Sequence, residues 1–391
     1  MRSRVRHPVL LALLLAGLAA ALGLSFVTQA PNRLLSGVGV PLTDVIGADS
    51  TQAWTLSPVL LLIAATLRTP TQALTRWLTL LGATGSLAGL TWLAGSHASA
   101  LLSDEMPLGR TSLGGGYWLM AILSGLAAAE ALRGWSARAG VSWIGSAFVV
   151  TPVVALLMSG HLDTLSLLKE YANRQEVFDA ALQRHLLLVA ATLVPTVLIG
   201  LPLGVLATRR PKVQPALLSV LNLIQTVPSI ALFALLMVPL AALAARWPVL
   251  AQWGISGIGV APAVTALTLY ALLPMVRSTV AGLGQIPPDV LDAATGMGMT
   301  RAQRFWRVEV PLAWPVWLAG LRVTTVQVLG LAMVSALIGA GGFGAVMFQG
   351  LLSSAVDLVL LGVVPVVALA VVADGLFKVL AEWTSRSSQG R

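Results

Sequence analysis

The chain has 391 residues, of which 57% are hydrophobic and only 10% charged, and its net charge is +9. Soluble domains carry about 25% charged residues, so this composition indicates an integral membrane protein. The absence of cysteine excludes disulfides, thiolate metal sites and cysteine nucleophiles, and the scattered basic residues form no patch suited to nucleic acid.

Long apolar runs predict an all-α polytopic membrane protein with about ten transmembrane helices, since crossing the hydrocarbon core takes about 20 residues. We expect the spans at 9–28, 53–67, 74–94, 113–132, 139–158, 185–207, 217–243, 257–281, 313–338 and 357–380. The first run is longer than the apolar region of a signal peptide, which has about 7–15 residues, so we expect it to stay uncleaved. The second run is short, because Pro58 and Arg68 bound it.

The basic residues predict the orientation of these spans. With the N-terminus inside, the inner loops hold roughly three times as many Lys and Arg as the outer loops. We therefore expect a multi-pass protein of the cytoplasmic (inner) membrane, in contact with its lipid, with both termini in the cytoplasm.

Polar intervals divide the chain into three expected parts. Residues 1–158 hold about five spans with short loops and form an accessory membrane region. Residues 159–184 form a polar linker outside the cell, and residues 185–382 hold the remaining spans as a second membrane domain. The sequence indicates no role for the accessory region.

The interval 287–311 is a long polar stretch in the second half, and its residues predict two helices. Pro287 and Pro288 suit a helix start, because the first-turn amides lack partners anyway. Gly296 and Gly298 interrupt this helix.

A second helix is expected to follow the glycines. Thr300 precedes Gln303 by three residues, the spacing of a capping box, and Pro311 is expected to end this helix. One interpretation is an amphipathic helix pair resting on lipid headgroups, with Trp and Arg as anchors. The other is a docking surface for a partner protein, on a face formed by Val290, Ala293, Ala294 and Met297.

The spacing within this interval resembles the EAA loop of binding-protein-dependent ABC importer permeases. That pattern is Glu-Ala-Ala, three residues, Gly, nine residues, Ile, one residue, Leu-Pro. Asp stands here for Glu, and Val stands for both Ile and Leu. The matching residues are Asp292, Ala293, Ala294, Gly298, Val308, Val310 and Pro311. The resemblance implies coupling helices that fit a groove in an ATPase subunit and transmit its movement to the membrane domain.

Four further stretches resemble permeases for osmoprotectants such as glycine betaine and choline: 225–236, 259–283, 314–322 and 338–350. This resemblance covers about 180–382 and implies that the last five spans form the type I permease core of an ABC importer. It also implies three partners: an ATPase dimer, a second permease copy or homologue, and an extracytoplasmic solute-binding protein. Residues 1–158 lie outside it.

The energy source is expected on another chain. The sequence has no G-x-x-x-x-G-K-[ST] motif to cradle ATP phosphates, so we expect a transport subunit that is not an enzyme and holds no cofactor. Coupling to protons or sodium needs acids inside the spans. Asp357 and Asp374 are the candidates, and both lie near span ends.

Uncharged polar residues within the spans suggest a translocation pathway. The candidates cluster around one proline-containing stretch and one mid-span tyrosine: Asn222, Gln225, Thr226, Pro228, Ser229 and Tyr270. Hydrogen bonds between helices are the alternative role for each of them. A quaternary ammonium site needs several aromatic faces, so we expect solute selection in the separate binding protein.

These observations predict the permease of an ATP-driven importer for an osmoprotectant. The alternatives are an importer of the same architecture for an amino acid such as methionine, and a membrane scaffold or sensor that uses the 287–311 loop as its output. A membrane-embedded enzyme ranks low, because the chain shows no paired acids or nucleophile–base set. The histidines lack metal-ligand spacing and are His7, His97, His161 and His185.

Overall fold

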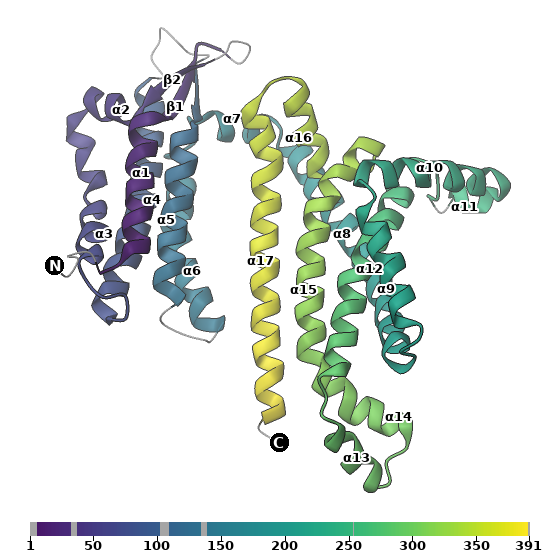
Figure 1. Ribbon diagram of the computed structural model, residues 1–391. Coiled ribbons are helices and arrows are strands. Elements are labelled where there is room, and N and C mark those ends of the chain that lie inside the picture. Colours follow the sequence, from purple (N-terminus) through teal and green to yellow (C-terminus); the bar gives the residue numbers. More distant parts are fainter. Residues whose placement is uncertain (1–5, 33–36, 102–108, 134–138, 253, 390–391) are drawn as a thin grey trace. The chain divides into compact units, whose positions relative to one another are not determined.

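The computed structural model describes residues 6–32, 37–101, 109–133, 139–252 and 254–389. The chain forms two compact units, Met1–Asn173 and Arg174–Arg391. Both are mainly helical, as the composition predicts, and Figure 1 shows their elements along the chain.

The first unit is a helical bundle. Its helices are α1 (Pro8–Gly23), α2 (Leu42–Ala48), α3 (Pro58–Thr66), α4 (Ala73–Ala100), α5 (Gly115–Arg133), α6 (Ala139–Met158) and α7 (Ser166–Asn173), with a 3-10 turn η1 (Ser50–Leu56) before α3. Helix α4 packs against α3, α5 and α6, and α1 packs against α5 and α3. Leu10, Leu62 and Ala127 belong to the buried core between these helices.

A small sheet lies at one end of this bundle (Figure 1). Its strands β1 (Ser25–Ala30), β2 (Val38–Pro41) and β3 (Arg110–Leu113) have the order β2-β1-β3, and both pairs are antiparallel. The sequence analysis did not predict these strands. The span expected at 9–28 is wrong at its end, because Phe26, Val27 and Thr28 favour a strand.

The second unit is likewise built of helices. They are α8 (Gln175–Arg209), α9 (Gln214–Thr226), α10 (Ser229–Arg246), α11 (Pro248–Gln252), α12 (Val260–Gly284), α13 (Pro288–Gly296), α14 (Arg301–Arg304), α15 (Val310–Val334), α16 (Phe343–Leu352) and α17 (Val356–Gln389). A π-helical turn η2 (Phe305–Glu309) precedes α15, and a 3-10 turn η3 (Ser335–Ile338) follows it. Helices α8, α12, α15 and α17 run side by side, and α13 and α14 protrude at one end (Figure 1).

Helix α12 is the centre of this unit, in contact with α8, α15, α9 and α10. Its close approach to α8 depends on small residues. A Cβ on Gly204 would lie 2.4 Å from Cβ of Thr279, so only glycine allows this spacing. Small residues serve the same purpose generally where membrane helices meet.

Two helices of this unit differ from the expected spans. Helix α8 begins at Gln175, within the stretch 159–184 that was expected to be a linker. The span expected at 217–243 is two helices, and Val227 and Pro228 separate them in extended conformations. Proline lacks an amide hydrogen and disfavours helical geometry at the preceding residue, so the helix ends there.

Among the described residues, seven helices are long and apolar enough to cross a membrane. They are Ala73–Ala100, Gly115–Arg133, Gln175–Arg209, Ser229–Arg246, Val260–Gly284, Arg301–Ile338 and Val356–Thr384. Pro8–Gly23, Ile144–Met158 and Phe343–Leu352 are apolar but shorter. The polytopic helical architecture is therefore confirmed, whereas the count of about ten spans is not.

Candidate functional site

The 287–311 loop has the predicted local structure of helix, glycine break and helix. Pro287 caps α13 and Pro288 is its first residue. The chain then turns at Gly298, whose φ of +79° lies in the left-handed region. The amides of Met297 and Gly298 donate to carbonyls of the last turn of α13, which closes that helix.

The second helix of the loop starts with the predicted capping box. The amide of Gln303 donates to the Thr300 hydroxyl over 3.3 Å, and the Thr300 amide donates to the Gln303 side chain over 2.9 Å. These two bonds satisfy amides that would otherwise lack partners at the helix start. Helix α14 therefore begins at a position fixed by its own sequence.

The prediction that Pro311 ends this helix is wrong. Helix α14 continues through the π-helical turn at Phe305–Glu309 into α15, where Pro311 lies in the first turn. Proline lacks the amide hydrogen that a continuous helix would use at this position, and the π-turn directly before Pro311 accommodates the disturbance by taking up one extra residue. The loop is thus joined to a membrane helix without a break.

The loop residues that match the EAA pattern differ in exposure. Asp292, Ala293, Gly298 and Pro311 are exposed, Ala294 is buried, and Val308 and Val310 are partly buried. Val310 packs with Leu283 and Trp317 at the base of the loop. The exposed face also carries Val290, Met297 and Trp306, the last with 68% of its surface exposed.

A buried carboxylate ties the loop to the helical bundle. Glu309 is only 3% exposed, and Arg209 at the end of α8 donates to one of its oxygens. Arg304 Nε donates to the other oxygen over 3.1 Å, and the same guanidinium reaches the Thr295 hydroxyl of α13 at 3.2 Å. The Glu309 carboxylate therefore connects α8 to α14, and Arg304 extends the connection to α13.

The sequence analysis gave no role to this cluster. Arg209 lies 100 residues before Glu309 in the chain, so no local spacing connects them. Glu309 was visible as an acid in a polar loop, but its burial follows only from the packing of α8 beside α15.

The proposed pathway residues gather around the break between α9 and α10. The Gln225 side-chain amide donates to the Tyr270 carbonyl over 2.8 Å, and the Tyr270 hydroxyl donates to the carbonyl of Val227. Tyr270 of α12 thus supports the extended residues of the break. Pro228 caps α10, and Ser229 is its first residue.

The other two pathway candidates lie on α9. Asn222 and Thr226 are exposed and one helical turn apart. Asn222 accepts a hydrogen bond of 2.7 Å from Arg277 of α12, whereas the Thr226 hydroxyl donates within its own helix to Leu223. Gln225 and Asn222 of the α9 segment therefore bond to α12, and Tyr270 bonds from α12 to the break, whereas Thr226 makes no such contact.

The acid Asp374 takes part in an ion pair between helices. It is bonded to Arg322 of α15 and to Lys378 one turn further along α17, at 2.8 Å from the latter. Its place near a span end, as expected from the sequence, did not indicate these partners. The pair joins α15 to α17, so Asp374 has a role in packing.

Two protein-family models match the chain. The binding-protein-dependent transport system inner membrane component matches residues 200–386. The N-terminal domain of the ABC transporter permease YehY matches residues 4–168. This N-terminal match lies wholly within the first compact unit.

Curated relatives agree with the match to the transport system inner membrane component. The osmoprotectant import permease protein OsmW of Salmonella typhimurium is 41% identical over 193 residues, which are 49% of this chain and 85% of the relative. The choline transport system permease protein OpuBB of Bacillus subtilis is 35% identical over 49% of this chain and 80% of its own. The carnitine transport permease protein OpuCB of Listeria monocytogenes is 36% identical with the same coverage.

Among solved structures, an inward-facing form of the MetNI methionine ABC transporter is similar to this chain. It aligns with 54% of this chain and 97% of its own, at 21% identity and a TM-score of 0.45.

Proposed function

The chain belongs to the family of binding-protein-dependent inner membrane transport permeases, and on that premise we propose that it is the permease of an ATP-driven importer for an osmoprotectant. The solute class rests on relatives whose names specify osmoprotectants, choline and carnitine. Glycine betaine and choline are the first solutes to test. Methionine is the second candidate, because a permease of this architecture can serve an amino acid.

The observation that carries the proposal is the exposed 287–311 loop with its capped helices. Its outer face presents Val290, Ala293 and Met297, which are apolar and exposed, so a partner can pack against them. On its inner side, Glu309 accepts hydrogen bonds from Arg209 of α8 and Arg304 of α14. Such a loop can transmit force, since a push on α13 or α14 is passed to α8 and α15 through the Glu309 cluster.

The mechanism we propose is alternating access. A loaded binding protein docks on the outer side, a dimer of separate ATPase chains closes in the cytoplasm, and the 287–311 loop passes that movement to the spans. The permease pairs with a second copy or a homologue, and both termini lie in the cytoplasm. Residues 1–158 form an accessory region, 159–184 an extracytoplasmic connection and 185–382 the permease domain.

The pathway proposal concerns the α9–α10 break. Extended backbone at membrane depth is tolerated where it is supported by protein or lines a cavity. The break presents polar groups of Asn222, Gln225 and Ser229 together with Pro228. We place the solute path along this side of α9, and solute selection in the binding protein.

Co-purification tests the coupling role. The wild-type protein and Gly298→Arg are solubilised and captured, and the accompanying proteins are identified by mass spectrometry. Arginine adds bulk and charge to an open surface position, so an ATPase with a P-loop should accompany the wild type and be lost from the variant. Gly298→Asn is the control, since asparagine tolerates the left-handed backbone and should keep the ATPase.

Two outcomes would contradict the coupling role. One is an ATPase that binds Gly298→Arg as well as the wild type. The other is an ATPase that is absent from both samples, which would leave the loop as a lipid-resting helix pair. Uptake of labelled glycine betaine, choline and methionine into reconstituted vesicles then identifies the solute.

A further inference from the structure

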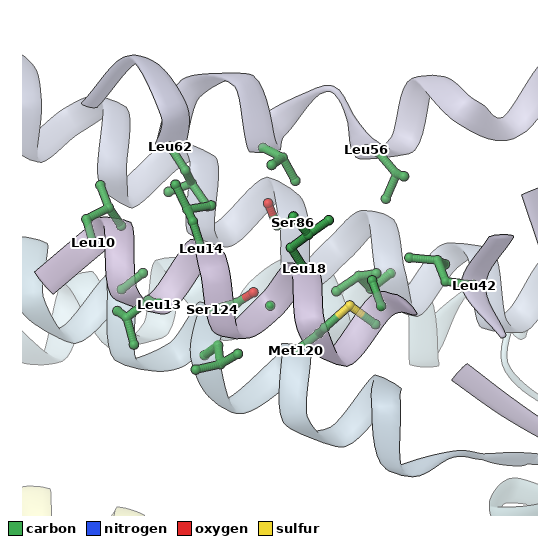
Figure 2. A pocket seen from close by; sticks show the side chains of 16 residues that line it. Leu10, Leu13, Leu14, Leu18, Leu42, Leu56, Leu62, Ser86, Met120 and Ser124 are labelled. Carbon is green, nitrogen blue, oxygen red and sulfur yellow. The ribbon is translucent and has the colours of Figure 1, made fainter. Parts of the chain in front are cut away.

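The first unit contains a cavity of about 220 Å³ between α1, α3, α4 and α5 (Figure 2). Side chains from these helices, and from α2 and the turn before α3, line it. Leu10, Leu14 and Leu62 contribute at one end, and Leu42 and Leu56 at the other. This cavity belongs to no part of the permease mechanism above.

The lining is almost wholly hydrocarbon, with two hydroxyl groups. Ser86 lies near the middle of α4, and Ser124 lies on the facing side of α5. Ser86 is only 5% exposed, and its Oγ has no hydrogen-bond partner among the described residues. Figure 2 shows its oxygen directed toward α1 across the cavity. A buried hydroxyl without a partner is unfavourable by about 1–3 kcal/mol. A polar ligand atom that hydrogen-bonds to Ser86 would remove this unfavourable contribution.

Water does not fit this site well. A buried water needs about two to four polar partners, and the cavity offers chiefly leucine and alanine side chains. An apolar cavity of about 150 Å³ holds benzene, so 220 Å³ accepts one substituted ring or a short alkyl chain. The ligand should therefore have an apolar body and a single polar atom.

The wall formed by α1 indicates where such a ligand comes from. Leu18 lines the cavity and is also 56% exposed on the outer surface of α1. Its neighbours Leu15 and Leu22 are exposed as well, which suits a surface in contact with lipid. Among the described residues, only α1 therefore separates the cavity from a molecule that is dissolved in the membrane on this side.

We propose that the first unit binds a small amphiphile from the membrane, with a ring or short alkyl body in this cavity and one hydroxyl or carbonyl group hydrogen-bonded to Ser86. The acyl chain of a bilayer lipid is the competing occupant. An acyl chain supplies hydrocarbon but no polar atom at the level of Ser86, so the Ser86 hydroxyl stays without a hydrogen-bond partner.

Met120 provides a direct probe, because its side chain lines the cavity. The full chain is placed in lipid nanodiscs with ¹³C-labelled methionine methyl groups, and the Met120 signal is assigned with Met120→Leu. The sample is titrated with phenol and with toluene, which match in size and differ in the hydroxyl. We expect a saturable shift of Met120 with both. At equal probe concentrations in the membrane, the affinity for phenol should be about fivefold higher, as one net hydrogen bond gives.

Three variants decide the result. Gly17→Leu fills the cavity, since a Cβ there meets only Leu123 at 3.9 Å, and it should abolish the shift. Gly125→Leu makes the same change on an exposed helix position with open space and should leave binding intact. Ser86→Ala should remove the preference for phenol while toluene still binds.

The proposal is overturned by any of three findings. If a lipid acyl chain fills the cavity, neither probe gives a saturable shift of Met120. A shift that persists in Gly17→Leu places the probes elsewhere. A preference for phenol that survives in Ser86→Ala removes the hydrogen bond to that residue.

Discussion

Glu309 is a charged side chain held inside protein, and its two arginine partners make that position tolerable. Desolvation of a carboxylate is unfavourable unless hydrogen bonds and opposite charge compensate for it. Arg209 and Arg304 supply both, each to a different oxygen. Removing the carboxylate charge would leave two guanidinium groups without a counterion.

We predict that Glu309→Gln lowers the free energy of unfolding by about 1–3 kcal/mol, the range for a lost charged hydrogen bond. Arg209 is partly exposed, so water moderates the loss. Thermal unfolding in detergent measures the effect. Asp179→Asn neutralises an exposed acid of the same unit and serves as the control. Equal melting temperatures for the two variants would show that the cluster is not stabilising.

Residues differ in how far their role can be predicted from sequence. The capping box at Thr300 and the turn at Gly298 involve neighbours within a few residues, so the spacing of these residues in the sequence was sufficient to predict both. The pairing of Glu309 with Arg209 depends on two helices meeting, and Ser86 has no sequence signal at all. Side chains whose partners are distant in the chain become visible only in the fold.

At the scale of elements, the break between α9 and α10 is set by a proline and supported by a tyrosine. Pro228 prevents a continuous helix, and the freed carbonyl of Val227 accepts the Tyr270 hydroxyl. A proline in a hydrophobic run predicts a local distortion of the helix, but it does not predict whether the helix bends or ends there. The sequence therefore predicted one span here, where the structure has two helices.

We predict that Tyr270→Phe lowers stability by about 1–2 kcal/mol and slows solute uptake, because the Val227 carbonyl loses its partner at the break. Uptake into reconstituted vesicles and thermal unfolding measure the two effects. Tyr117→Phe is the matched control, since it removes a tyrosine hydroxyl bonded to Thr91 in the first unit. If both variants slow uptake equally, the break has no special part in transport.

At the scale of the whole molecule, each unit has buried clusters of its own. Leu93 and Phe26 lie in a core of the first unit, and Leu273 and Val276 lie in one of the second. Composition predicted a membrane protein, and the long apolar runs predicted that it is helical. The small sheet was missed because three short strands give weak alternation beside long apolar runs.

We predict that a chain lacking residues 1–158 inserts into the membrane and still co-purifies with its ATPase, since the 287–311 loop and its anchors all lie in the second unit. Membrane fractionation confirms insertion, and capture followed by mass spectrometry detects the ATPase. Loss of the ATPase from a stable, inserted protein would show that the first unit is required for assembly.

Orientation is a separate prediction for the whole chain. Reporter fusions should place residue 165 outside and residue 300 in the cytoplasm, because the inner loops carry the excess of Lys and Arg. An enzyme reporter active only outside the cytoplasm, paired with one active only inside it, measures this. The opposite pattern would reject both the orientation and an ATPase contact at the 287–311 loop.

The π-helical turn at Phe305–Glu309 sets the rotational phase between this loop and its membrane helix. Each residue advances an α-helix by about 100°, and a π-turn accommodates one extra residue without breaking the helix. Losing a single residue there would keep the helix continuous but turn α14 and Trp306 toward a different side. The direction in which the outer face of the loop points is thus fixed by a residue count, independently of which residues lie on that face.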